Sequence, residues 1–224
     1  MTSLPVMDPR QVPVIQVDSH LPPVHVARLQ PDALRQRFLA PPVWQAELVA
    51  ESKFMDRTPM HAAVLIPIVM HTEPTVLLTQ RPAHMSTHAG QIAFPGGKLD
   101  QEDVDAVAAA RREAYEEVGL APQWLEVLGQ LPIYTTGSAF LVTPVVALVQ
   151  PGFKVLPNAQ EVSDVFEVPL SFLMDPANHH HHRLLWQGVE RHWLSMLYHD
   201  GLRERYIWGA TAGMLRNFYR FLSA

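Results

Sequence analysis

The chain has 224 residues, 17 of them Lys or Arg and 22 Asp or Glu, so its formal net charge is −5 at pH 7. A chain of this length can bury a substantial core as one domain, and its net charge argues against electrostatic binding to nucleic acid. It contains no cysteine, which excludes disulfide scaffolds, zinc thiolate sites and thiol catalysis.

The sequence also bears on the compartment of the protein. Its N-terminal residues lack the basic region and apolar core of a secretory signal. No apolar run approaches the roughly twenty residues that span a membrane. The final residues, FLSA, differ from a peroxisomal address of the Ser-Lys-Leu type. We therefore expect a cytoplasmic protein without a membrane partner or a nucleic-acid partner.

Residues 1–45 are predicted to form an N-terminal extended arm and a short helix, and residues 46–224 the main domain. The first 28 residues are rich in Pro and Val and show no usable period. PDALRQRFLA, which begins with Pro31, has apolar residues at helical spacing and predicts the short helix. We expect the arm to lie on the domain or to be partly loose, and contact with another subunit is the functional alternative.

Three strands and a helix are predicted next. The apolar run from His61 to Met70 is typical of a strand buried on both faces, and TVLLTQR follows a turn as its hairpin partner. QIAFPGG is predicted as a third strand that ends in a glycine turn. The helix should occupy about residues 104–118 and end at Gly119, with small Ala residues that let it pack closely on a sheet.

The last third of the chain is predicted to add strands and a closing helix. Two or three strands are expected in WLEVLGQLPIYTTGSAFLVTPVVALVQ, then a strand and a helical turn in DVFEVPLSFLMD. LLWQGVERHWLSMLYH predicts a hairpin about Gln187 and Gly188, and GATAGMLRNFYRFLSA predicts the final helix. Strands mixed with two principal helices indicate an α/β fold with a mixed β-sheet sandwiched between helices.

Three carboxylates stand out in the central helix. Glu116 and Glu117 follow Glu113 by three and four residues, so both lie near it on one side of the helix. Their mutual repulsion would be relieved by a divalent cation, and carboxylate oxygens are natural ligands of Mg²⁺. The pattern therefore indicates metal-assisted attack on a phosphate chain. The alternative is a solvated helix face in which the glutamates pair with Arg111 and Arg112.

This segment resembles the signature of the Nudix hydrolases, G-x5-E-x7-R-E-U-x-E-E-x-G-U, where U is a bulky aliphatic residue. The matching residues are Gly97, Arg112, Glu113, Glu116, Glu117, Gly119 and Leu120. The chain has one residue more than the pattern between Gly97 and Arg112, Asp103 stands in place of the first Glu, and Ala114 is small for its position. The resemblance implies that Asp103 pairs with Arg112.

The run into the signature resembles that of the coenzyme A pyrophosphatase subfamily. LLTQRPAHMSTHAGQIAFPGG, from Leu77 to Gly97, is similar to LLTxRxxxLxxHxGQxxFPGG, and NAQEVSDVFEVPL and IWGATAGML are similar to later parts of that subfamily. The resemblance implies the Nudix fold and hydrolysis of the pyrophosphate of coenzyme A and its derivatives, with Mg²⁺ or Mn²⁺. The products would be 3′,5′-ADP and 4′-phosphopantetheine.

Two other functions stay open at this point. One is a Nudix hydrolase that acts on ADP-ribose or another nucleoside diphosphate derivative. The other is a catalytically silent Nudix module that senses or binds a ligand, which the intact REAYEE sequence disfavours. In each case the partner is a small molecule, and a homodimer is left open.

The resemblance also implies roles for the residues of the signature. Glu116 and Glu117 would bind the metal, and Glu113 would be either a third ligand or the base that takes a proton from the attacking water. Gly97 would offer a backbone carbonyl to the metal, and its lack of a side chain would also permit the turn. Arg112 would orient the helix carboxylates through ion pairs.

Three residues outside the helix complete the expected site. Glu161 is either a further ligand or base, or an ordinary loop carboxylate. Arg81 and His88 lie on either side of the segment before the signature and could contact substrate phosphates. For His88 a structural role is the alternative.

A run of four histidines, His179 to His182, is a weaker candidate for a metal site. Four consecutive imidazoles cannot all face one ion in a strand or a helix. We therefore expect this run to be a solvated loop.

Overall fold

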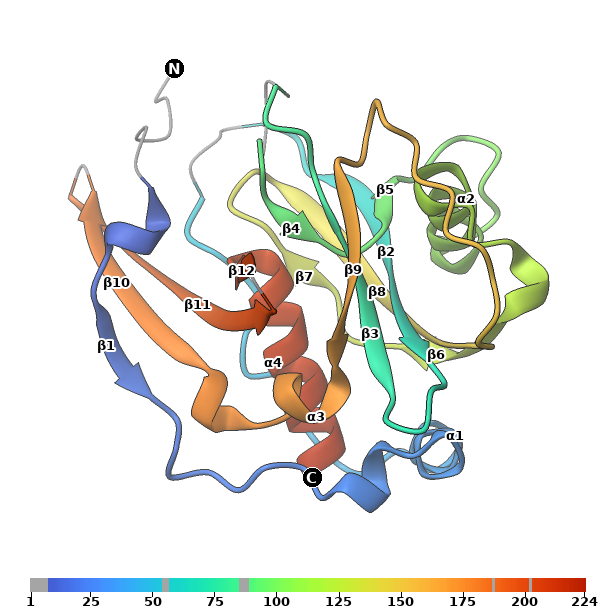
Figure 1. Cartoon of the computed structure of the whole chain (residues 1–224). Coiled ribbons are helices and arrows are strands. Elements are labelled where there is room, and N and C mark those ends of the chain that lie inside the picture. Colours follow the sequence, from blue (N-terminus) through green and yellow to red (C-terminus); the bar gives the residue numbers. More distant parts are fainter. Residues whose placement is uncertain (1–7, 54–56, 85–88, 187, 202) are drawn as a thin grey trace.

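The computed structural model describes residues 8–53, 57–84, 89–186, 188–201 and 203–224. These residues form two β-sheets with helices around and between them (Figure 1). None of the helices in these ranges combines the length and the apolar character needed to cross a membrane.

The larger sheet is built around a parallel pair of strands. β2 (Met60–Val69) and β8 (Phe140–Val149) pair along their whole length, with Met60 opposite Phe140 and Val69 opposite Val149. The antiparallel strands around this pair are β3 (Thr75–Gln80), β4 (Ile92–Ala93), β5 (Gly96–Lys98), β6 (Leu125–Gln130), β7 (Tyr134–Thr135) and β9 (Asp164–Pro169). The sheet is therefore mixed.

The segment QIAFPGG forms two short strands where the sequence predicted one. β4 pairs with β3, whereas β5 pairs with the first half of β2, on the same edge at which β3 pairs with the end of β2. β5 begins at Gly96, where an added Cβ would lie 2.6 Å from the Cα atom of Val64. A glycine is needed here because the two backbones approach so closely.

Helices α2 (Ala106–Val118) and α4 (Ala210–Ser223) lie on opposite faces of this sheet (Figure 1). Successive side chains of a strand point to opposite faces, and β2 shows this clearly. Ile66 and Ile68 belong to the core cluster that contains α4, and Leu65 and Val69 to the cluster that contains α2. This arrangement confirms the predicted mixed sheet between helices.

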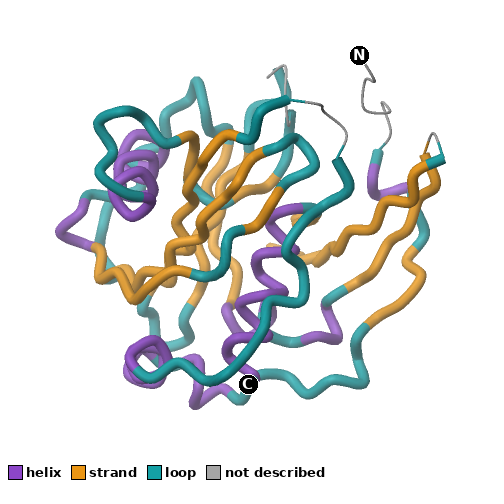
Figure 2. The backbone as a smooth tube through the Cα atoms, turned by 180° about the vertical axis from the view of Figure 1, so that it is seen from behind, coloured by secondary structure: helices purple, strands orange, loops and turns teal. Residues whose placement is uncertain are grey.

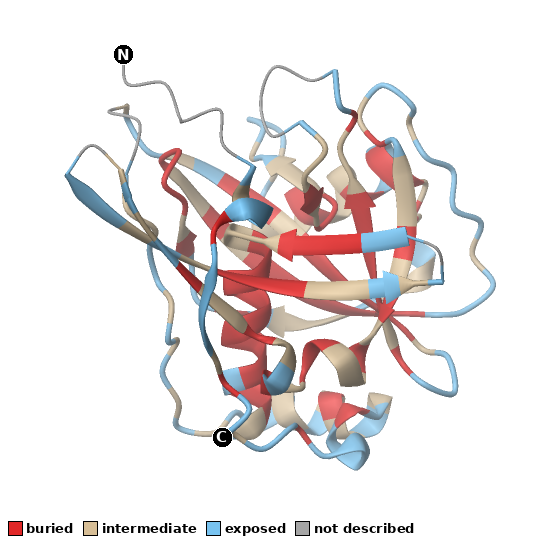
Figure 3. Ribbon diagram, turned by 60° about the vertical axis from the view of Figure 1, so that its left-hand side comes forward, coloured by how far each residue is buried: buried red, intermediate tan, exposed pale blue. Residues whose placement is uncertain are grey.

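A second, antiparallel sheet packs on the far side of α4. Its strand order is β1 (Val14–Val17), β10 (His180–Trp186), β11 (Val189–Asp200) and β12 (Arg203–Trp208). β10 and β11 confirm the predicted hairpin, although Gln187 lies outside the described residues. The sequence did not predict β12. Because α4 is covered from both sides, nearly all of it is buried (Figure 3).

The N-terminal segment packs against both sheets. Helix α1 (Pro31–Leu39) confirms the predicted short helix, and Leu34 on it is fully buried. Seen from behind, the chain that follows α1 passes over α4 (Figure 2), and the N–H groups of Glu47 and Leu48 both donate to Oδ1 of Asn217 at 3.0 Å. The described part of the arm thus lies on the domain, and the boundary at residue 45 stays a prediction.

The remaining helical segments are short. They are α3 (Leu170–Leu173) and the 3₁₀ turns Pro9–Gln11, Val26–Leu29, Pro122–Trp124 and Pro176–Asn178.

The expectation of a solvated loop at the histidine run is wrong. His180 to His182 belong to β10, and both His179 and His182 are buried. Their ring nitrogens have partners: His179 Nε2 donates to the carbonyl of Leu173 at 2.9 Å, and His182 Nδ1 donates to the carbonyl of Val12 at 2.9 Å. The histidines are enclosed because β1 pairs with β10 while α4 packs beneath it.

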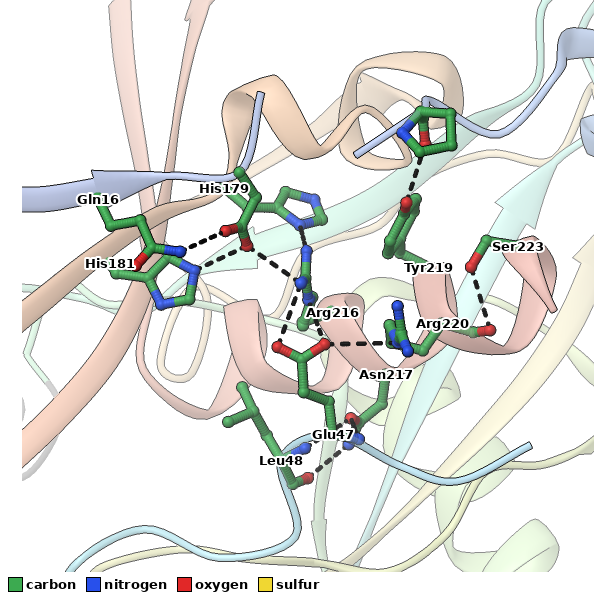
Figure 4. Close-up of polar contacts among 12 residues, drawn as sticks. Gln16, Glu47, Leu48, His179, His181, Arg216, Asn217, Tyr219, Arg220 and Ser223 are labelled. Atoms are coloured by element: carbon green, nitrogen blue, oxygen red, sulfur yellow. Dashed lines mark hydrogen bonds and ion pairs between the residues drawn. The ribbon is translucent and has the colours of Figure 1, made fainter. Parts of the chain in front are cut away.

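The buried guanidinium of Arg216 on α4 contacts residues from the N-terminal arm, the loop after α1 and the histidine run (Figure 4). Arg216 Nη2 lies 3.0 Å from Oδ2 of Asp18, and Arg216 Nε donates to Glu47 at 2.9 Å. Arg216 Nη1 donates to Nδ1 of His179 at 3.1 Å, and His181 Nε2 donates to Asp18 at 2.7 Å. The arm, the loop after α1, β10 and α4 therefore meet at one charged cluster.

Candidate functional site

Helix α2 has a defined beginning and end. The side chain of Asp105 accepts a hydrogen bond from the N–H of Ala108 at 2.8 Å, which caps the first turn. The helix ends at Gly119, whose φ of 72° is a left-handed conformation that glycine adopts without steric cost. The buried Ala109, Ala110 and Ala114 let α2 pack closely on the sheet, so its glutamates meet the turn that contains β5.

Glu117 is the most enclosed of the three helix carboxylates. Only 6% of the residue is exposed, and its Oε2 accepts a hydrogen bond from the N–H of Gly96 at 3.2 Å. The pKa of Glu117 is raised to about 8, chiefly by burial and also by the negative charges of Glu113 and Glu161. The Gly96 hydrogen bond and the positive charge of Arg81 act in the opposite direction. The electrostatic environment of Glu117 therefore includes two other carboxylates and one guanidinium.

Glu113 lies against the glycine turn. A Cβ atom added to Gly97 would be 2.5 Å from Cδ of Glu113, so a larger residue at position 97 would displace the carboxylate. Burial also raises the pKa of Glu113, against the lowering effect of Arg112. Gly97 is thus required by the carboxylate that occupies the space beside it, whereas its own φ lies outside the left-handed region, so the expectation that the turn needs glycine at this position is wrong.

Arg112 connects the loop before α2 to the helix carboxylates. Its Nη1 lies 2.9 Å from Glu113 Oε1 and 3.0 Å from Glu116 Oε2, and its Nη2 lies 2.9 Å from Asp103 Oδ2. The Asp103–Arg112 pair expected from the sequence is present, and the hydrogen bond from Arg112 lowers the pKa of Asp103. Arg112 is placed to orient the carboxylates.

Glu161 and Arg81 come from two loops, one tied to the end of α2 and one that follows β3. The N–H of Asn158 donates to the backbone carbonyl of Glu117 at 2.9 Å, and the N–H of Glu161 donates to the carbonyl of Asn158 at 2.9 Å. Arg81 directly follows β3. His88 lies outside the described residues, so its position relative to these groups stays a prediction.

The side chains as they lie do not form a metal-binding geometry. Within the described ranges, no group of three or more His, Asp or Glu side chains could hold a metal ion. The reason is that Glu113 and Glu116 turn toward Arg112 and Glu117 turns toward Gly96. The donor set is nevertheless all-oxygen, which suits Mg²⁺ or Mn²⁺. The negative charges of neighbouring carboxylates raise the pKa values of Glu113 and Glu117, and a divalent cation would relieve this repulsion.

Two residues at this site were not predicted from the sequence. The N–H group of Gly96 donates a hydrogen bond to Glu117, and Asn158 anchors the loop of Glu161 to the end of α2. The adjacent glycines at 96 and 97 were a signal for the first. No local pattern indicates the second, because its partner is a backbone carbonyl on a distant element.

Residues 59–189 match the NUDIX domain family. The chain is 39% identical over 172 residues to a protein of Photorhabdus laumondii named "Uncharacterized Nudix hydrolase NudL", covering 77% of this chain and 90% of that protein. It is 44% identical over 156 residues to the protein of the same name from Escherichia coli, covering 69% of this chain and 79% of that one.

Among solved structures, a Nudix hydrolase from M. smegmatis, RenU, is 26% identical and has a TM-score of 0.45, covering 51% of this chain and 73% of that one. The family match and the curated relatives establish that the chain belongs to the NUDIX domain family. Membership supports Nudix pyrophosphohydrolase activity on a nucleoside diphosphate derivative.

Proposed function

We propose that this protein hydrolyses the pyrophosphate bond of coenzyme A and its derivatives, with Mg²⁺ or Mn²⁺, to 3′,5′-ADP and 4′-phosphopantetheine. The observation that carries the hydrolytic part is that Glu113 and Glu117 both contact the glycine turn, while the loop of Glu161 is anchored to the end of α2. The choice of coenzyme A rests on the similarity of the run from Leu77 to Gly97 to the coenzyme A pyrophosphatases.

The carboxylates would hold the cation at the glycine turn. Glu113, Glu116 and Glu117 would bind it together with the backbone carbonyl of Gly97. When bound, the cation would neutralise charge on the diphosphate and make water a better nucleophile. Arg112, which contacts Glu113 and Glu116 as they lie, would stay paired with Asp103 and keep the two glutamates near the site while their oxygens turn to the cation.

The proton of the attacking water needs an acceptor nearby. Glu161 and Glu113 are the two candidates, because each lies close enough to raise the pKa of Glu117. Arg81 would bind phosphate oxygens, for which its planar guanidinium is well suited. Burial of the carboxylates would strengthen these interactions by excluding water.

The test is product analysis with the purified protein, Mg²⁺ and a panel of diphosphates. The panel contains coenzyme A, ADP-ribose, diadenosine polyphosphates and oxidised dGTP. We expect 3′,5′-ADP to be released from coenzyme A faster than any product from the other compounds. EDTA should abolish this activity, and excess Mg²⁺ or Mn²⁺ should restore it.

Other outcomes would change the proposal in defined ways. Fastest cleavage of ADP-ribose or of a nucleotide would overturn the coenzyme A specificity and keep the Nudix chemistry. If neither cation supports cleavage of any compound, the hydrolytic proposal fails and a ligand-binding module is favoured.

Two further expectations belong to the proposal. We propose that the protein is cytoplasmic, and its oligomeric state stays open between a monomer and a homodimer. Fractionation of cells tests the first, and light scattering on the purified protein tests the second, where a mass of one chain would exclude the dimer.

A further inference from the structure

Arg205 on β12 reaches out of the second sheet and into the end of the main sheet. Only 6% of its side chain is exposed. Its Nη1 lies 2.9 Å from Oδ2 of Asp164, and its Nη2 lies 2.6 Å from Oδ2 of Asp200. Its guanidinium carbon is 4.0 Å from the ring centroid of Phe166. A planar cation held by two carboxylates and an aromatic face has little freedom to move.

The first contact fixes one end of the loop that carries Glu161. Asp164 is the first residue of β9, three residues after Glu161. The other end of this loop is Asn158, which is hydrogen-bonded to the backbone of Glu117 and lies three residues before Glu161. Glu161 is therefore held between an anchor on α2 and an anchor on Arg205.

A second contact of the same guanidinium supports the strand that leads to Arg81. Arg205 Nη1 donates to Oε1 of Gln80 at 3.3 Å, and Nε2 of Gln80 donates to the carbonyl of Gly90 at 3.3 Å. Gln80 is the last residue of β3 and directly precedes Arg81. Its backbone carbonyl also accepts the N–H of Ser163 at 2.8 Å. One arginine thus contacts both segments that deliver groups to the site.

We propose that Arg205 is a positioning residue for diphosphate hydrolysis, which holds Glu161 and Arg81 at the helix carboxylates through Asp164 and Gln80. This inference rests on the function proposed above. It gives the second sheet a role in the site, because Arg205 belongs to β12. A displacement of about 1 Å in a reacting group can reduce turnover about a hundredfold, so an indirect contact of this kind matters for the rate.

The chain provides a matched control in Arg203. It pairs with the same Oδ2 of Asp164 at 2.7 Å, but its side chain is 67% exposed. Exposed ion pairs are screened by water and hold their partners weakly. Replacement of Arg203 therefore removes a positive charge from the same carboxylate without removing the buried anchor.

The experiment compares Arg205→Gln with Arg203→Gln by hydrogen exchange and by steady-state kinetics. For Arg205→Gln we expect faster amide exchange in residues 158–163 and a kcat lower by about tenfold to a hundredfold. For Arg203→Gln we expect exchange and kcat like those of the unmodified protein. If Arg205 acts through Glu161, its replacement should cause little further loss in a Glu161→Gln background.

Three results would overturn the proposal. They are unchanged exchange in Arg205→Gln, faster exchange with unchanged kcat, and a loss that is fully additive with Glu161→Gln. If Arg205→Gln does not fold, Arg205→Lys replaces it, since it keeps the charge but cannot contact Asp164 and Asp200 in the same planar geometry.

The exchange measurement needs no substrate, which separates this proposal from the proposed function. If the unmodified protein cleaves no diphosphate, the proposed function fails by itself. Unchanged exchange in Arg205→Gln would still overturn the positioning role, and faster exchange confined to the two contacted segments would support it.

Discussion

The properties of Glu117 depend on its surroundings as much as on its being a glutamate. Its carboxylate is enclosed between α2 and the glycine turn, accepts a hydrogen bond from Gly96 and lies near two other carboxylates. An isolated negative charge in such a place is costly. Its burial is therefore better explained by a role with a cation than by a role in folding.

At this scale we predict that Glu117→Gln loses activity and keeps the fold. The amide has the same volume as the carboxylate, and its oxygen can still accept the Gly96 hydrogen bond, but it carries no charge for a metal. We expect kcat to fall about a hundredfold or more while the midpoint of thermal unfolding changes little. Steady-state kinetics and thermal denaturation measure the two effects.

The control for this variant is Glu102→Gln, which removes the same charge from an exposed loop residue before α2. It should leave kcat unchanged. Full activity of Glu117→Gln would show that the metal assignment is wrong.

Helix α1, which the sequence assigned to the N-terminal arm, contributes to the hydrophobic core of the domain. Leu34 is fully buried, whereas Leu39 on the same helix is 77% exposed. The buried Leu34 belongs to the core cluster that contains α4. The helix is therefore part of the folded domain in energetic terms, and not only an attached arm.

We predict that Leu34→Ala reduces the free energy of unfolding by about 2–5 kcal/mol, because it leaves a cavity in the core. Leu39→Ala, on the same helix, should change it by less than about 0.5 kcal/mol. Urea denaturation of the two variants measures both values. Equal effects of the two substitutions would show that α1 does not contribute to the core in solution.

The charged cluster around Arg216 connects the N-terminal arm, the loop after α1 and β10 to helix α4. His179 accepts a hydrogen bond from Arg216 through Nδ1 and donates to Leu173 through Nε2, so it is neutral in this arrangement. The pKa of His179 is lowered to about 4, chiefly by burial and also by the charge of Arg216, while Leu173, Asp18 and Asp175 oppose the shift. A proton on Nδ1 would face the guanidinium.

We predict that this histidine makes the fold less stable in acid. Between pH 6.5 and about 4 the unfolded chain binds a proton at His179 and the folded protein does not, so stability falls as the pH falls through this window. Above pH 6.5 the contribution is fully present. One such group changes the free energy of unfolding by at most about 1.4 kcal/mol per pH unit.

The measurement is the urea midpoint as a function of pH for the unmodified protein and for His179→Gln. The raised pKa of Glu117 contributes a trend of opposite sign, so the difference between the two proteins isolates the histidine. The unmodified protein should lose more stability than the variant between pH 6.5 and 4. Parallel curves would contradict this prediction.

The sequence by itself determined the elements whose causes are local. The cap at Asp105, the glycine at 119 and the spacing of the glutamates lie within one segment, so α2 and its acidic face could be predicted from neighbours in the chain. The strand β2 followed from an apolar run in the same way. The Asp103–Arg112 pair came from the resemblance, and both partners lie close in sequence.

Only the tertiary structure decided which distant segments meet. The burial of His179 requires α4 beneath β10, and the anchor of Glu161 requires Arg205 from β12. Neither contact leaves a pattern in its own segment, because the partners are far apart in the chain and each is individually an ordinary polar residue. The sequence therefore indicated the carboxylates, and the packing of the second sheet placed Arg205 against Asp164 and Gln80 beside the loops that carry Glu161 and Arg81.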